Sequence, residues 1–176
     1  ASFHACRTDR PKEYPPDIKL SRSSQMAQEP TPAPPRTRDR YNHWTTVSIR
    51  YCDQDPLGHI NNVAMAAYLE QARVGLVYPL LKSKGGPNFE IVIARLVIDY
   101  LNELHFPGNV EIGTRIARLG NKSFTLHHAV FMAGEEVCAA TSEVTSVFFD
   151  VVKRESVMPT FALRAALEEF MQQQPA

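Results

Sequence analysis

The chain has 176 residues, a formal net charge of zero and an apolar fraction of 44%. This length suits one domain with tails, because domains usually span roughly 100–200 residues. The balanced charge shows no basic stripe, so nucleic acid is not an expected partner. The longest mainly apolar run, residues 63–81, contains Glu70, Gln71 and Arg73 and is too polar to span a membrane. Three widely spaced cysteines suit a reducing cytoplasm better than a disulfide framework or a zinc site.

Residues 1–40 differ in composition from the rest of the chain. Prolines recur, charges alternate in sign, and no apolar periodicity is present. Such a composition cannot bury enough apolar surface to fold, so we predict a disordered Pro-rich extension. The segment lacks the apolar core of a signal peptide. The folded domain is expected over residues 41–173.

The domain is predicted to begin with a strand over residues 43–51, where β-branched and aromatic residues partly alternate. A polar stretch follows, and then a helical pattern over residues 62–81 with Asn61 as its N-cap. The first turns of this helix are apolar on almost every side, which predicts burial on every side. Pro79 and then Gly85-Gly86 are expected to end the helix.

Four strand-like segments follow, over residues 91–104, 110–119, 123–132 and 137–152, and a short helix over residues 161–171 closes the chain. Consecutive strands joined by tight turns indicate antiparallel pairing. We therefore predict an α+β hot-dog fold, a curved and mainly antiparallel sheet wrapped around one long central helix. Such a sheet leaves an edge and a face to cover, so a homodimer or homotetramer is expected.

The junction between the first strand and the long helix concentrates polar groups. Two carboxylates, a histidine and two asparagines lie within ten positions, in the motif Asp53-x-Asp55-x-x-Gly58-His59-x-Asn61-Asn62. The start of a helix presents unpaired backbone N–H groups and the positive end of the helix dipole. This is a suitable place to stabilise an oxygen that becomes negative during a reaction.

This motif, followed by Tyr68-x-Glu70-x-x-Arg73, resembles the signature of the 4-hydroxybenzoyl-CoA thioesterase-like (4HBT-like) family of hot-dog acyl-CoA thioesterases. Further matches are Asp99-Tyr100-Leu101, Pro107-Gly108 and the run from Arg118 to Phe124. The resemblance covers roughly residues 43–152 and implies a hydrolase that releases a carboxylic acid and CoA. It implies no cofactor, because the CoA thioester is the substrate.

The resemblance assigns the catalytic carboxylate to Asp55, as a nucleophile or as a general base for water. The alternative is that Asp55 only caps the following turn. The oxyanion donor is expected at the backbone N–H of Asn62, and Gly58 is expected to let the backbone approach the thioester. His59 either orients the thioester carbonyl or Asp55, or is hydrogen-bonded within the turn.

The resemblance also assigns substrate and CoA contacts. Arg118, Lys122 and Ser123 lie at the hairpin where family members contact the nucleotide, although an ordinary solvated turn would also suit them. Tyr68 is expected to line the acyl pocket together with strand residues of a partner chain. Glu70 is expected to pair with Arg73, or else to reach a neighbouring active site. We predict no metal site.

Two other functions fit the same fold. Hot-dog hydratases and dehydratases pair an acid with a histidine in a motif like D-x-N-P-x-H, with five positions from Asp to His. The spacings here are six from Asp53 to His59 and four from Asp55, which favours a thioesterase. A non-catalytic acyl-CoA-binding regulatory module is the third possibility, because fold does not fix function.

Overall fold

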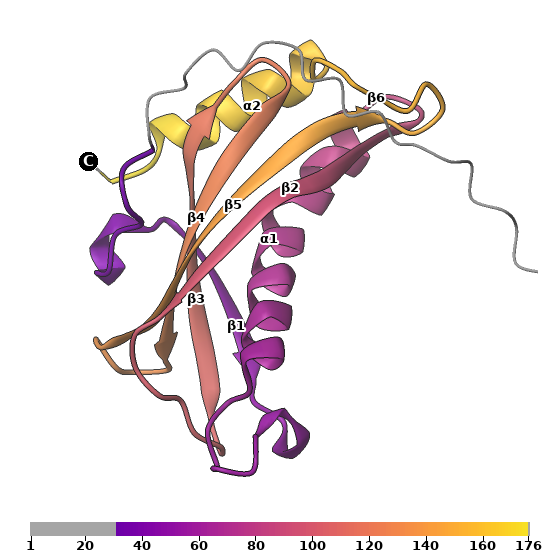
Figure 1. The fold of residues 1–176 in the computed structure, drawn as a ribbon. Coiled ribbons are helices and arrows are strands. Elements are labelled where there is room, and N and C mark those ends of the chain that lie inside the picture. The colour runs from indigo at the N-terminus through magenta and orange to yellow at the C-terminus, as the bar shows by residue number, and fades with distance from the viewer. Residues whose placement is uncertain (1–30, 176) are drawn as a thin grey trace, which may run out of the picture. The chain divides into compact units, whose positions relative to one another are not determined.

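We describe residues 31–175 of a computed structural model of the chain (Figure 1). Two short 3-10 helices, Arg38–Arg40 and Tyr51–Asp53, flank the first strand. The strands and α-helices are, in chain order, β1 (His43–Ser48), α1 (Asn62–Lys84), β2 (Phe89–Tyr100), β3 (Asn109–Leu119), β4 (Ser123–Met132), β5 (Cys138–Asp150), β6 (Glu155–Ser156) and α2 (Phe161–Gln172). The predicted α+β hot-dog architecture is confirmed, and the two-residue strand β6 is an addition to it.

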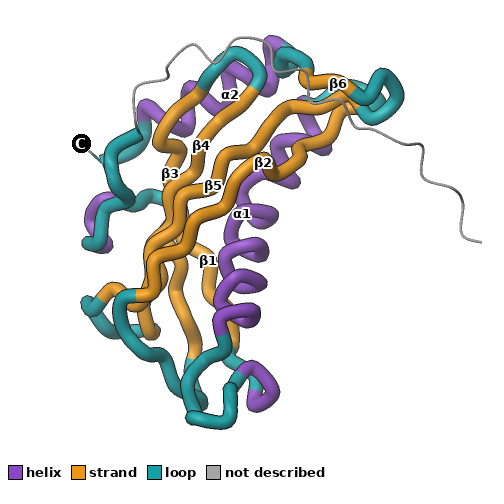
Figure 2. Tube along the Cα trace, in the orientation of Figure 1, coloured by secondary structure: helices purple, strands orange, loops and turns teal. Residues whose placement is uncertain are grey.

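The strands form one antiparallel sheet in the order β1-β3-β4-β5-β2, with β6 paired to the far end of β5. Figure 2 shows the strong twist of this sheet, with α1 lying along one face and α2 near the end of β3 and β4. The central strand β4 is buried along nearly its whole length because both of its faces are covered. The outer strand β2 is much more exposed.

Helix α1 begins as the sequence predicts. The side chain of Asn61 accepts a hydrogen bond from the backbone N–H of Val63 at 2.7 Å, which confirms its N-cap role. The buried residues form a stripe with helical spacing that faces the sheet: Ala64, Met65, Tyr68, Leu69, Ala72, Leu76, Val77 and Leu81. The opposite side is open, with Val63, Val74 and Tyr78 exposed. The prediction that α1 is buried on every side is therefore wrong for the single chain.

Pro79 does not end α1, which continues to Lys84, whereas the predicted stop at Gly85-Gly86 is confirmed because Gly85 is the C-cap. Pro79 lacks an N–H and therefore removes one helical hydrogen bond. The apolar stripe continues past it to Leu81, which is buried in the core. We attribute the continuation to this packing, which outweighs a single lost hydrogen bond.

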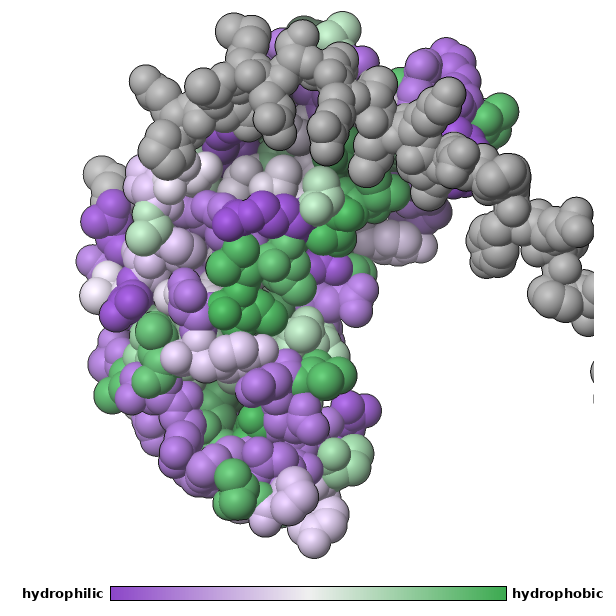
Figure 3. Space-filling model, viewed as in Figure 1, coloured by the Kyte–Doolittle hydropathy of each residue, from purple (hydrophilic) through white to green (hydrophobic). Residues whose placement is uncertain are grey.

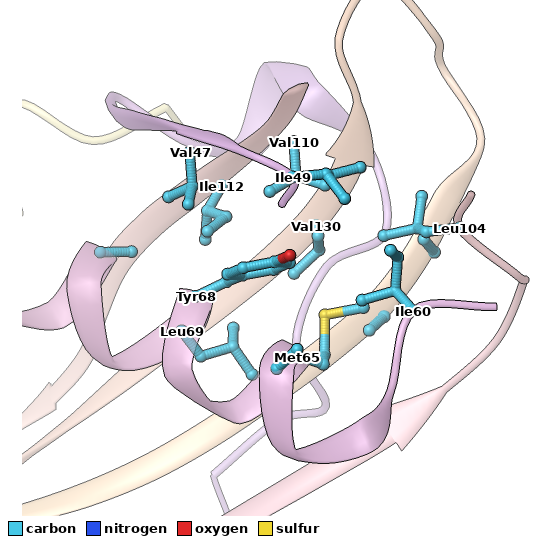
Figure 4. Close-up of a cluster of buried hydrophobic side chains, with 14 residues drawn as sticks. Val47, Ile49, Ile60, Met65, Tyr68, Leu69, Leu104, Val110, Ile112 and Val130 are labelled. Atoms are coloured by element: carbon cyan, nitrogen blue, oxygen red, sulfur yellow. The ribbon is translucent and has the colours of Figure 1, made fainter. Parts of the chain in front are cut away.

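The core beneath α1 consists of two apolar clusters. One lies under the first half of the helix and contains Tyr68, whose ring projects from α1 toward β3 and β4 (Figure 4). The other lies under the second half and includes Leu163 and Leu167 of α2. A row of polar residues occupies neighbouring register positions across four strands: His43, Thr114, His128 and Ser142.

Residues 35–41, at and just before the predicted domain boundary at residue 41, pack against the opposite face of the sheet. Tyr41 is buried, and its hydroxyl donates to the carbonyl of Pro35 at 2.6 Å. Its ring lies directly over Gly113, where a Cβ would approach Tyr41 Cγ to 2.7 Å. Arg38 binds the carboxylate of Glu111 at 2.7 Å. Residues 1–30 of the predicted extension lie outside the described residues.

Neither α1 nor α2 is long and apolar enough to cross a membrane, and these are the α-helices of the described chain.

Candidate active site

The polar motif folds into a tight turn that Asp55 organises. Asp55 Oδ1 accepts hydrogen bonds from the backbone N–H of Leu57 at 2.8 Å and of His59 at 3.1 Å. The N–H of Gly58 donates to the Asp55 carbonyl at 3.0 Å, which closes the turn. Gly58 has a φ of 83°, a conformation that glycine adopts readily. An added Cβ would meet nothing within 4 Å, so Gly58 is required for conformation and not for space.

Asp53, at the start of this turn, connects it to Arg50 and to helix α1. Its carboxylate is buried and accepts hydrogen bonds from the Arg50 backbone N–H at 2.8 Å, the Arg50 guanidinium at 2.7 Å and the Tyr68 hydroxyl at 2.5 Å. The Arg50 hydrogen bond, aided by Tyr68, lowers the pKa of Asp53 to about 2. Asp53 therefore remains a buried carboxylate that joins the turn to α1.

The turn leads directly into α1. The Asn61 N–H donates to the Asp53 carbonyl at 2.8 Å, which places the helix start beside the turn. Asn62 is the first helical residue, so its N–H belongs to the amides that have no acceptor within the helix. The hydroxyl of Tyr100, at the end of β2, donates to the Asn62 carbonyl at 3.3 Å.

A cavity of about 250 Å³ lies between this turn and the chain segment that follows β2. It is lined by Asp55, His59, Ile60, Asn62, Met65, Tyr100, Leu101, Asn102, Glu103 and Leu104. Three of the predicted catalytic residues, Asp55, His59 and Asn62, thus share one cavity. Figure 4 shows the side chain of Met65 beside Ile60, with Leu104 on the other side of Ile60, and all three residues line this cavity.

The second wall of the cavity, residues 100–104, was not part of the sequence prediction. Backbone hydrogen bonds hold this wall to β5. The N–H groups of Leu101 and Asn102 both donate to the carbonyl of Ala139, at 2.9 and 3.0 Å. Glu103 projects from this wall, and its Oε2 lies 3.3 Å from Nε2 of His59. The sequence placed these residues at the end of a predicted strand over residues 91–104 and matched Asp99-Tyr100-Leu101 to the family, but neither signal indicates the segment that this wall faces.

The predicted nucleotide contacts lie elsewhere in the chain. Lys122 and Ser123 are at the β3–β4 hairpin, and Arg118 precedes it at a bulge in β3. The other end of β3 lies on the side of the Asp55 turn. There the N–H of Ile49 donates to the carbonyl of Gly108, just before β3 begins. Eleven strand residues separate these two ends, which corresponds to roughly 30 Å. One chain therefore does not bring these residues to Asp55.

The remaining predicted site residues lie along α1. Tyr68 is in the core and its hydroxyl is used by Asp53, so contact with an acyl group stays a prediction. Glu70 and Arg73 pair at 3.4 Å, as their spacing predicts. Both line a second cavity of about 250 Å³ between α1 and β2, whose other walls are mainly apolar.

Comparison with known proteins gives concordant matches. The profile of a family described as the thioesterase-like superfamily matches residues 49–174. The crystal structure of the PA5185 protein from Pseudomonas aeruginosa strain PAO1 is 31% identical, with a TM-score of 0.69, and the match covers 82% of this chain and 99% of that one. A thioesterase from Thermus thermophilus, complexed with coenzyme A and Zn, is 26% identical over 77% of this chain and 98% of that one, with a TM-score of 0.65.

A curated relative is the uncharacterized protein YsmA of Bacillus subtilis (strain 168), which is 27% identical over 88 residues. That match covers 50% of this chain and 60% of the length of YsmA.

Proposed function

Since this chain belongs to the thioesterase-like superfamily, we propose that it hydrolyses acyl-CoA thioesters at the cavity lined by Asp55 and Asn62. The observation that carries the proposal is that Asp55 and Asn62, the first residue of helix α1, line one small cavity. Thioester hydrolysis needs these two elements, a group that delivers an oxygen nucleophile and a donor for the developing oxyanion.

Asp55 has one carboxylate oxygen committed to the turn and one available for chemistry. Oδ1 accepts two backbone hydrogen bonds, whereas no hydrogen bond to Oδ2 is found among residues 31–175. As a nucleophile, the carboxylate would attack the thioester carbon, release CoA as the thiolate and form a mixed anhydride that water hydrolyses. As a general base, it would take a proton from the attacking water.

The oxyanion donor in this proposal is the Asn62 N–H at the start of α1. Helix geometry leaves this amide without an intrahelical acceptor, and the helix dipole favours negative charge beside it. His59 lies on the same cavity, but its ring Nε2 is 3.3 Å from Glu103 Oε2. Orientation of the substrate carbonyl by His59 would therefore require its ring to exchange this partner.

We further propose a homodimer formed through the free edge of β2. This 12-residue strand pairs only with β5 among the described strands, and it exposes Val92, Ile93 and Leu96. Figure 3 shows that apolar side chains also gather on the face of the sheet opposite α1, where Figure 1 draws β2 and β5. An apolar edge strand of this length is normally covered, and pairing with a second copy would cover it.

Such a dimer would complete the substrate site. A two-fold axis across β2 pairs the strand with itself in antiparallel fashion, so the Tyr100 end of one chain meets the Phe89 end of its partner. The cavity of Asp55 would then adjoin the partner's cavity between α1 and β2, which contains Glu70. This mainly apolar cavity would receive the acyl group, and the partner's Lys122 hairpin would lie at the same end as Asp55.

We assign the protein to the cytoplasm. Among residues 31–175 both cysteines are free, and Cys52 is exposed, which suits a reducing compartment.

The test is thiol release from a panel of short, long and aromatic acyl-CoA thioesters by wild type and Asp55→Asn. Asparagine keeps an oxygen for the hydrogen bonds from Leu57 and His59, so the turn is retained while the carboxylate is lost. We expect kcat to fall about 100-fold or more. The exposed Asp39→Asn is the matched control and should leave kcat unchanged.

Near-normal hydrolysis by folded Asp55→Asn would remove Asp55 from the mechanism. If wild type binds acyl-CoA in calorimetry but releases no thiol from any member of the panel, the chain is a binding module. Hydration of an enoyl-CoA without thiol release would instead identify a hydratase.

A further inference from the structure

Three potential metal ligands from two separate loops meet beside the cavity of Asp55. His59 follows the catalytic turn, whereas Glu103 and His105 belong to the loop between β2 and β3. The backbones of His59 and His105 pair as an isolated antiparallel bridge, which brings their ring centroids to 5.2 Å. Glu103 Oε2 lies 3.3 Å from Nε2 of His59 and 3.7 Å from Nε2 of His105.

We propose that His59, Glu103 and His105 form a binding site for one divalent ion of the zinc class. Their three ligand atoms all lie within 4.8 Å of one another. Zinc binds histidine nitrogen and carboxylate oxygen at about 2.0–2.2 Å in a tetrahedron, so its ligand atoms stand roughly 3.3 Å apart. Glu103 Oε2 is 3.3 Å from His59 Nε2 and 3.7 Å from His105 Nε2, which is close to this value. A small side-chain movement would bring the two histidine nitrogens to the same spacing.

A hydrogen bond already sets the ring of His105 for this role. Its Nδ1 lies 3.1 Å from the carbonyl oxygen of Gly58. Because a carbonyl only accepts, Nδ1 carries the hydrogen in this bond, which leaves Nε2, on the side of Glu103, as the nitrogen that can bind a metal. Metal-binding histidines usually have their second nitrogen fixed in this way, which orients the ring and raises its basicity as a ligand.

The choice of metal follows from the donor set. Imidazole nitrogens favour zinc and its transition-metal neighbours, whereas magnesium prefers oxygen ligands and retains its water. The side chains of Glu103 and His105 are 65% and 57% exposed, so an ion can reach the site from solution. Three protein ligands leave a fourth position open. His59 and Glu103 also line the cavity of Asp55, so a bound ion would lie beside that cavity.

This site could not be recognised in the sequence, because His59 is more than forty residues from Glu103 and His105 and no metal-ligand spacing links them. The competing explanation is a hydrogen-bonded cluster in which Glu103 bridges two histidines without an ion. The two explanations differ in whether the protein binds zinc, and this difference is measurable without substrate. The metal site therefore does not depend on the proposed hydrolase activity.

The experiment titrates Zn²⁺, and separately Mg²⁺, into the metal-free full chain in a calorimeter. We expect one Zn²⁺ per chain and no Mg²⁺ binding. His105→Ala and Glu103→Gln should each weaken zinc binding about 10- to 100-fold or more. Glu155→Gln changes an exposed carboxylate far along the chain on β6 and should leave the zinc affinity unchanged.

Because His4 and Cys6 are also capable ligands and lie outside the described residues, the double variant His4→Ala with Cys6→Ser is titrated in parallel. It should bind zinc as wild type does. Nuclear magnetic resonance of the histidine ring nitrogens in wild type gives a measurement that requires no variant. Zinc should shift Nε2 of His59 and His105 and leave His127 and His128 unchanged.

The proposal is overturned if wild type binds no zinc, or if His105→Ala and Glu103→Gln bind it as wild type does. Loss of the site in the His4→Ala, Cys6→Ser variant, or zinc-dependent shifts at other histidines only, would equally overturn it.

Discussion

His128 is a titratable side chain that is fully buried in the core and makes no hydrogen bond there within the described chain. It lies on β4 between the two apolar clusters, and neither ring nitrogen has a hydrogen-bond partner among the described residues. Burial, reinforced by the positive charge of Arg73, lowers the pKa of His128 from 6.5 to about 3. Between these two values the unfolded chain binds more protons than the folded chain. Folding stability must therefore fall as pH decreases from 6.5 toward 3.

This difference can be measured with His128→Leu, which fills the position with an apolar side chain that does not titrate. Between pH 6.5 and about pH 5, wild type should lose about 1.5 kcal/mol more unfolding free energy than the variant. Urea denaturation at each pH gives both values, and the two curves should run parallel above pH 7. An equal loss in the two proteins would show that His128 is not the group that titrates.

Individual residues of the Asp55 turn were predictable because their hydrogen-bond partners are close in sequence. Asp55 binds the N–H groups of Leu57 and His59, and Asn61 binds that of Val63, all within four positions. Glu103 and His105 could not be assigned in the same way. Their partners, His59 and the carbonyl of Gly58, are more than forty residues away, and only the strand topology brings them together.

At the scale of elements, the predicted hairpin strands agree with the structure to within a few residues, whereas helix α1 differs in two respects. Residue preference correctly identified its start but could not show how much of its surface the sheet covers. Pro79 is a strong local signal for a helix end, and it was overridden by the packing of Leu81. Local rules describe backbone preferences, and burial against distant elements can outweigh them.

Pro79 should therefore reduce the stability of α1 while contributing little packing, since it is exposed. Pro79→Ala restores an N–H that can donate to the carbonyl of Gly75, four residues earlier. We expect the free energy of unfolding to rise by about 1–3 kcal/mol, as measured by urea denaturation. Gln71→Ala, at another exposed position of α1, is the control and should change stability by only a few tenths of a kcal/mol. A destabilised Pro79→Ala protein would mean that the proline ring supplies essential contacts.

At the scale of the whole molecule, the proposed substrate site requires two chains paired through the apolar edge of β2. Measuring the oligomeric state therefore tests that site. Leu96 is 42% exposed on this strand, on the same face as the core residue Val144 opposite it. In the proposed dimer this side chain is buried at the interface, so Leu96→Lys would place a charge there. Light scattering during gel filtration should show a dimer or larger assembly for wild type and a monomer for the variant.

Val137→Lys is the control for this experiment, because Val137 is similarly exposed in the turn before β5 and away from the β2 edge. It should keep the mass of wild type. Monomeric wild type, or an unchanged mass for Leu96→Lys, would contradict pairing through β2. The monomeric variant should also lose thioester hydrolysis, because the acyl cavity of its partner would be absent.

The two walls of the cavity are held at different points of the fold and are also joined to each other. The turn is tied to α1 through the buried Asp53, and the facing wall is bound to the backbone of β5 at Ala139. The Ile60 N–H joins the two walls by donating to the Leu104 carbonyl at 2.9 Å. Because none of these three links uses the side chain of Glu103, substitutions at that position can change the charge at the cavity mouth while both walls stay in place.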